Sequence, residues 1–145
     1  MKKYLKVLTP LLITIIGSGL FIMFGKVKYN DLTLPPLAPK GFMFSIAWTI
    51  IYLIFAYTML DGYEKKGAYF LYLYILVLHL IWNLFFFFLG SFVISLVVLF
   101  LIILVSIVFI YYLAKEKKKY LYLNLFYLVW LLLATYLSIG IIILN

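Results

Sequence analysis

Long runs without a charged residue limit what this chain can fold into more than any other feature. Its charges fall into four clusters, and the apolar runs between and after them lie at about 7–25, 41–60, 68–89, 91–114 and 120–144. A helix needs roughly 20 apolar residues to cross the hydrocarbon core of a bilayer. A helix also pairs its own backbone N–H and C=O groups, which find no partner in lipid. The five runs therefore predict membrane-spanning helices.

Composition supports the same interpretation. Hydrophobic residues make up 69% of the chain and charged residues only 11%, whereas a soluble domain carries about 25% charged residues. The uncharged stretch from Gly67 to Ala114 is too long for one crossing, and Gly90 can supply a tight turn inside it. We therefore predict an all-α integral membrane protein, a bundle of five transmembrane helices that forms one domain over residues 1–145.

The lysines predict the orientation. The N-terminus, the second loop and the fourth loop together carry nine lysines, against three for the first loop, the third loop and the C-terminus. Positively charged loops stay in the cytoplasm, so the N-terminus is expected inside and the C-terminus outside. The lysine-rich, arginine-free composition favours a bacterial cytoplasmic membrane.

The net charge of +8 does not indicate nucleic-acid binding, because the lysines border the predicted spans and no arginine is present. The lipid bilayer, with its anionic headgroups, is the expected partner of these lysines. The chain has no cysteine, which excludes thiolate chemistry and cysteine-based metal sites.

Three helices carry stripes of aromatic, polar and small residues at helical spacing. The stripes are Phe44, Trp48 and Tyr52 in the second run; His79, Trp82, Asn83 and Phe86 in the third; and Trp130, Ala134, Leu137 and Ser138 in the fifth. Ordinary helix packing can explain any one stripe. Three together favour an aromatic cavity with a few hydrogen-bonding groups, as a large planar ligand requires.

His79, the only histidine, falls near the middle of the third run. A polar group at that depth must find a partner in the bundle or in a cavity. Ligation of haem iron and switching with pH are alternatives, but a neutral, hydrogen-bonded role in packing or in the pocket is favoured. We expect no metal site and no obligatory cofactor.

The segment from Tyr29 to Gly41 holds Pro35, Pro36 and Pro39. Because proline restricts the backbone, this segment is expected to be a fairly stiff lid at the membrane surface. A plain connector is the alternative.

Residues from three separate regions match the motifs of one family. The matching residues are Tyr29, Leu32, Pro35, Pro39, Phe44, Trp48, Thr49 and Tyr52; then Leu78, Trp82, Phe86 and Phe87; then Tyr127, Trp130, Ala134, Leu137, Leu144 and Asn145. In these residues the chain resembles the TspO/MBR family, the tryptophan-rich sensory proteins that include the mitochondrial translocator protein. The chain departs from the family pattern at Lys28, Leu37 and Phe42, where the family has tryptophans, and at Lys40, His79, Asn83, Ser138 and Ile142.

The resemblance implies a five-helix bundle, often a dimer, whose pocket beneath the first loop accepts porphyrins and benzodiazepine-type ligands. It also implies links to cholesterol and to light-dependent porphyrin breakdown in bacteria. The ligand-binding residues expected from the stripes and the resemblance together are Tyr29, Pro39, Phe44, Trp48, Tyr52, His79, Trp82, Asn83, Phe86, Trp130, Ala134 and Ser138.

The leading hypothesis is a membrane receptor, sensor or carrier for a porphyrin such as protoporphyrin IX or haem. A porphyrin-degrading enzyme is one alternative. A small ion-coupled transporter is another, although the four acids, Asp31, Asp61, Glu64 and Glu116, are expected in loops and leave only His79 in the membrane. A sterol is a further candidate ligand.

A scaffolding role stays open as well. Gly17, Ser18 and Gly19 would allow close helix contact within the bundle or between subunits. The resemblance also leaves a homodimer open. The third helix, a dimer surface in some relatives, is bulky here, so the sequence does not decide for or against dimerisation.

Overall fold

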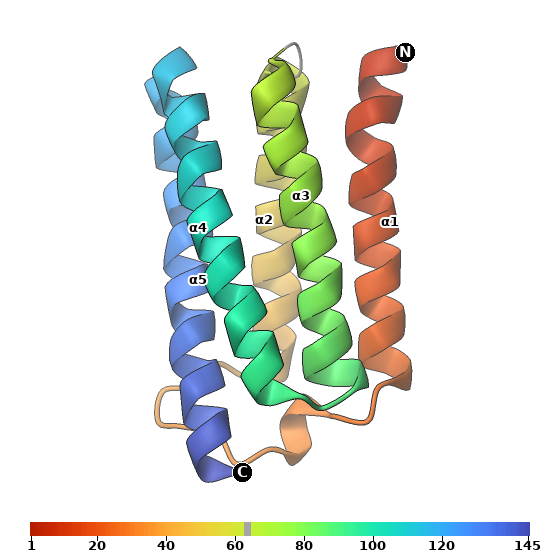
Figure 1. Cartoon of the computed structure of the whole chain (residues 1–145), viewed down its shortest axis with the longest axis vertical. Helices are drawn as coiled ribbons and strands as arrows, with labels where there is room; N and C mark the ends of the chain where they lie inside the picture. Colours follow the sequence, from red (N-terminus) through yellow and green to blue (C-terminus); the bar gives the residue numbers. More distant parts are fainter. Residues whose placement is uncertain (63–64) are drawn as a thin grey trace.

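Five long helices make up the computed structural model, which describes residues 1–62 and 65–145. They are α1 (Lys2–Phe24), α2 (Gly41–Gly62), α3 (Lys66–Asn83), α4 (Phe92–Glu116) and α5 (Lys118–Leu144) (Figure 1). A 3₁₀ turn, η1 (Tyr29–Asp31), lies in the first loop, and a π-helical turn, η2 (Leu84–Phe88), continues α3. All five helices are long and apolar enough to cross a membrane. The predicted five-helix membrane bundle is confirmed.

The helices extend beyond the apolar runs at the lysine-rich end. α1 already begins at Lys2, and α5 begins at Lys118. Lysine is a good helix former, so backbone hydrogen bonding continues past the point where hydropathy ends. The helical hydrogen bonding of α2 and α4 likewise continues past the apolar runs, so Asp61 and Glu116 lie in the last turns of these helices, and their expected place in loops is wrong.

Asp31, by contrast, lies in the first loop, within η1. Glu64 lies outside the described residues.

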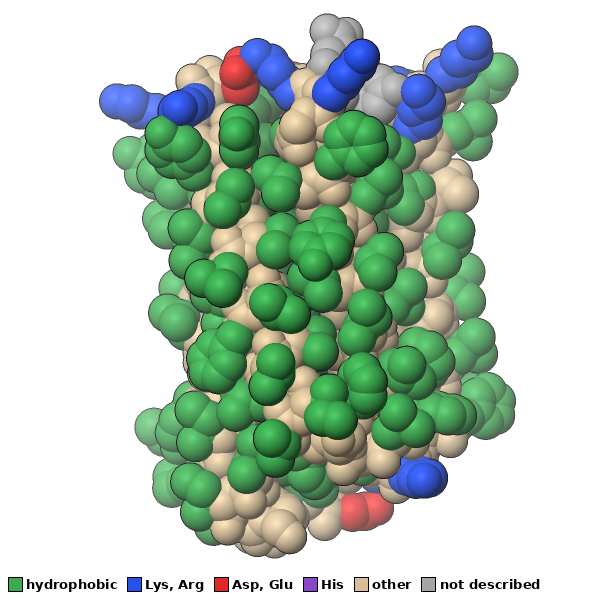
Figure 2. Space-filling view, viewed as in Figure 1, with side chains coloured by type: hydrophobic (Ala, Val, Ile, Leu, Met, Phe, Trp, Pro, Cys, Tyr) green, Lys and Arg blue, Asp and Glu red, His purple; other side chains and the backbone are tan. Residues whose placement is uncertain are grey.

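The chain runs up and down through the bundle. The N-terminus and the α4–α5 connection lie at one end, and the first loop, the α3–α4 turn and the C-terminus lie at the other (Figure 1). α4 packs against α3 and α5, α1 packs against α3 and α2, and α2 also contacts α5. The side chains of lysine gather at the N-terminal end, with a wide apolar band below them (Figure 2). Which end faces the cytoplasm stays a prediction.

Ion pairs join the two connections at the lysine-rich end. Asp61 accepts hydrogen bonds from Lys117 at 2.9 Å and from the hydroxyl of Tyr120, and Lys65 pairs with Glu116 at 2.5 Å. The hydrogen bond to Asp61 raises the pKa of Lys117 above its usual value. These contacts tie the end of α2 and the start of α3 to the α4–α5 connection.

Glycine forms the turn between α3 and α4, as expected. Gly90 has a φ of +70°, which costs glycine little and other residues more. Just before it, η2 redirects the backbone: Ser91 N donates to Phe85 O at 2.7 Å. The carbonyl of Phe87 is then free to accept from Val27 N at 3.0 Å. The turn is thereby hydrogen-bonded to the segment that leaves α1.

The first loop is held against the C-terminal end of α5. Asn145 bonds Thr33 twice: its Oδ1 accepts from Thr33 N at 3.0 Å, and its Nδ2 donates to Thr33 O at 2.9 Å. Tyr136 donates to the carbonyl of Pro36 at 2.6 Å. These contacts support the expectation of a stiff segment, and whether it acts as a lid or is a plain connector stays a prediction.

Candidate functional site

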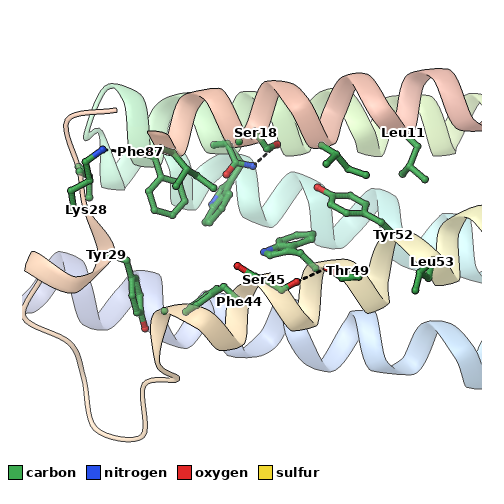
Figure 3. A pocket seen from close by; sticks show the side chains of 18 of the residues that line it. Leu11, Ser18, Lys28, Tyr29, Phe44, Ser45, Thr49, Tyr52, Leu53 and Phe87 are labelled. Atoms are coloured by element: carbon green, nitrogen blue, oxygen red, sulfur yellow. Dashed lines mark hydrogen bonds between the residues drawn. The ribbon is translucent and has the colours of Figure 1, made fainter. Parts of the chain in front are cut away.

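A cavity of about 670 Å³ lies between α1, α2 and α3, next to the first loop (Figure 3). Three helices and the loop supply its walls. The lining residues are Leu8, Leu11, Ile15, Ser18, Gly19 and Ile22 of α1; Val27, Lys28, Tyr29 and Asn30 of the loop; Gly41, Phe44, Ser45, Trp48, Thr49, Tyr52, Leu53 and Ala56 of α2; and Trp82, Asn83 and Phe87.

The wall formed by α2 is largely aromatic. Phe44, Trp48 and Tyr52 are spaced four apart, so their rings follow one face of the helix. The rings of Trp48 and Tyr52 lie 5.6 Å apart and tilted by 30°. On the same helix, the Thr49 hydroxyl donates to the carbonyl of Ser45 at 2.7 Å. This wall therefore offers flat apolar surfaces with hydroxyl groups at intervals.

The wall formed by α3 is fixed to α1 by a side-chain hydrogen bond. Asn83 Nδ2 donates to Ser18 Oγ at 3.1 Å and to its own helix at His79 O, 2.8 Å away. Trp82, which is 9% exposed, stacks on Phe86 at 5.1 Å. The indole N–H of Trp82 is buried and has no hydrogen-bond partner among the described residues.

The first loop forms the mouth of the cavity. Tyr29 donates to the carbonyl of Pro39 at 2.8 Å, and its ring meets the ring of Phe44 edge-on at 4.7 Å. Burial raises the pKa of Tyr29 above its usual value, so the phenol stays neutral and donates. Pro39 itself does not line the cavity but holds Tyr29 in place.

His79 lies one layer behind the cavity. Its ring is 1% exposed and sits 5.0 Å from the ring of Trp48. Its Nε2 lies 2.8 Å from the hydroxyl of Tyr127, which also accepts from Ser106 at 3.1 Å. The histidine thus belongs to a buried polar chain that joins α3, α4 and α5. Among the described residues no group of three histidines or acids could hold a metal ion.

Half of the residues expected at the site line this one cavity: Tyr29, Phe44, Trp48, Tyr52, Trp82 and Asn83. The stripes of α2 and α3 therefore meet. The other six lie elsewhere: Pro39, His79 and Phe86 stand behind lining residues, and Trp130, Ala134 and Ser138 belong to α5.

The stripe of α5 packs against α2 but does not line the cavity. The ring of Trp130 contacts the ring of Phe44 edge-on at 5.3 Å, so it buttresses a lining residue without reaching the cavity. Ser138 is 2% exposed and Ala134 is half-buried. These residues face the helix bundle rather than the pocket.

The wall formed by α1 was not expected at the site, although small residues there had suggested close helix contact. Gly17 makes that contact within the bundle, because a Cβ at this position would lie 2.7 Å from Leu80 Cδ2. Ser18 and Gly19, by contrast, line the cavity. Ser18 followed by Gly19, a small hydroxyl residue and then a glycine, was the available signal for a helix face that leaves room beside its neighbour.

In addition to its mouth at the first loop, the cavity is open along one flank, between α1 and α2. Several lining residues on both helices are exposed, including Ile15 at 39%, Ile22 at 45% and Leu53 at 64%. Because these positions lie inside spans, the opening faces the hydrocarbon of the bilayer.

Comparison with known proteins gives one finding. The model of the TspO/MBR family matches residues 7–144, nearly the whole chain. A search of curated proteins found no match.

Proposed function

The chain belongs to the TspO/MBR family, and on this premise we propose that it binds a flat, porphyrin-like molecule in the cavity between α1, α2 and α3. Family membership supports a membrane sensor or receptor role in general. The observation that carries the finer proposal is that aromatic rings from two helices, those of Trp48 and Trp82 among them, line one cavity.

The size and lining of the cavity suit such a ligand. Small-molecule sites typically enclose about 300–1,000 Å³ and combine apolar walls with a few polar groups, and this cavity measures about 670 Å³. An aromatic contact contributes about 0.5–1.5 kcal/mol beyond the area that it buries. Ser18, Thr49 and Asn83 add groups that can orient a polar edge of the ligand.

The open flank suits a ligand that dissolves in the membrane. A porphyrin in the bilayer would reach the cavity sideways, between α1 and α2, without crossing the first loop. The same route lets the molecule leave again, so the geometry suits a sensor or a carrier equally well.

Titration with protoporphyrin IX tests the proposal. The protein in lipid nanodiscs is followed by quenching of tryptophan fluorescence, with Trp48→Ala as the test variant and Trp130→Phe as the control, because Trp130 lies outside the cavity. Loss of one aromatic contact predicts about 2- to 13-fold weaker binding for Trp48→Ala. Trp130→Phe should bind like the wild type. Absence of saturable quenching in the wild type removes the proposal.

Porphyrin breakdown in light is the second candidate function, favoured by the two indoles that line the cavity, those of Trp48 and Trp82. An indole beside a photoexcited porphyrin can act as an electron donor. The test is the decay of the porphyrin absorption band under illumination, compared with free porphyrin in empty nanodiscs. Equal decay rates exclude this function and leave ligand binding unaffected.

A further inference from the structure

Among the described residues that line the cavity, Lys28 is the one that carries a charge. It stands at the mouth, in the loop that leaves α1 (Figure 3). Within the described part of the chain, no carboxylate forms an ion pair with its ammonium group. The cavity therefore has a formal charge of +1 at its mouth and none in its interior.

Backbone carbonyls hold this ammonium group in place. Lys28 Nζ donates to Met23 O at 2.8 Å and to Ile22 O at 3.2 Å. Both carbonyls belong to the last turn of α1, where the partial negative charge of the helix end favours a cation. An ammonium group has three donors, so one N–H is left for a ligand.

We propose that the ligand is a carboxylic acid whose carboxylate pairs with Lys28 while its flat apolar body lies deeper, between Trp48 and Trp82; this inference rests on the proposed function and specifies its ligand. A charged group at the mouth beside an uncharged, largely apolar interior selects an amphiphile with its acid at one edge. A neutral flat molecule of the same shape leaves the ammonium group without its anionic partner.

A comparison of two porphyrins in four proteins tests this inference. Protoporphyrin IX carries two carboxylates, and its dimethyl ester carries none but keeps the same ring. Both are titrated into nanodiscs of phosphatidylcholine that hold the wild type, Lys28→Gln, Lys28→Arg or Lys26→Gln. Lys26 is a matched control, because it is an exposed lysine of the same segment that does not line the cavity.

The quantity that decides is the ratio of the two dissociation constants within each protein. Partition of each porphyrin into the lipid cancels when this ratio is compared between proteins. A charge-assisted hydrogen bond at a partly exposed mouth predicts a preference for the acid of roughly 5- to 10-fold. Lys28→Gln should lose the preference, while Lys28→Arg and Lys26→Gln should keep it.

Two results overturn the inference, and they differ. If both porphyrins bind and Lys28→Gln keeps the wild-type ratio, the carboxylate does not use Lys28, and the proposed function survives. If neither porphyrin binds the wild type with saturation, the proposed function fails and the inference fails with it.

Discussion

Gly140 offers a sharp test of how the first loop is held. A Cβ at this position would lie 2.5 Å from Cγ and 2.6 Å from Cβ of Pro35. Carbon atoms in contact sit about 3.5–4.0 Å apart, so in Gly140→Ala the proline must retreat by about 1 Å. A proline ring cannot rotate out of the way, and the loop backbone has to move with it.

The displacement acts on hydrogen bonds that dock the loop. Thr33 shares two of them with Asn145, and Pro36 accepts a third from Tyr136. Each hydrogen bond contributes about 0.5–1.5 kcal/mol net, so their weakening costs about 2 kcal/mol. Replacing glycine by alanine inside a helix stabilises the helix by about 1 kcal/mol. Gly140→Ala is therefore expected to destabilise the protein by about 1 kcal/mol.

Gly19→Ala is the matched control, because an added Cβ there meets nothing within 4 Å. It keeps the helical gain of about 1 kcal/mol, so the two variants should differ by about 2 kcal/mol. Denaturant unfolding followed by circular dichroism measures the difference. Trypsin cleavage after Lys40, which is exposed beside the loop, reports on loop docking. The reasoning is refuted if Gly140→Ala is as stable as Gly19→Ala and its loop resists trypsin equally.

Two further predictions concern the polar contacts of the bundle. Tyr127→Phe removes the hydroxyl that His79 contacts at 2.8 Å and should cost about 1–3 kcal/mol in unfolding assays, whereas Tyr122→Phe, at a side chain 68% exposed, should stay within about 0.5 kcal/mol of the wild type. The pKa of Lys117 is raised by its hydrogen bond to Asp61, so the stabilisation by this pair should be complete at neutral pH and fade as the pH rises through that pKa. Unfolding curves of the wild type and Lys117→Gln should therefore converge at alkaline pH, and a constant gap between them would contradict the assignment.

The number of helices could be predicted because membrane crossing is a local property. Each apolar run is long enough to be recognised as a span by itself. Between the third and fourth runs there is no charged residue, and Gly90 marks the turn there. The exact helix ends could not be predicted in the same way. Lys2 and Lys118 are polar, so hydropathy ends before them, yet their backbone groups continue the helical hydrogen bonding.

The site could be predicted only in part, because periodicity shows which residues share a face but not which helix lies opposite. Trp48 and Trp130 sit in stripes of the same kind. One faces the cavity and the other packs behind Phe44. Lys28 was visible as a departure from the family pattern, but its place at the mouth depends on how the chain leaves α1.

The open flank between α1 and α2 has a consequence for any measured affinity. Acyl tails of the host lipid, or the tails of a detergent, have access to the same space as the ligand and are present in vast excess. Every dissociation constant is then the outcome of a competition, and shorter or more unsaturated tails should change it with no change in the protein. Values obtained in different micelles or bilayers will be comparable only after that competitor has been matched.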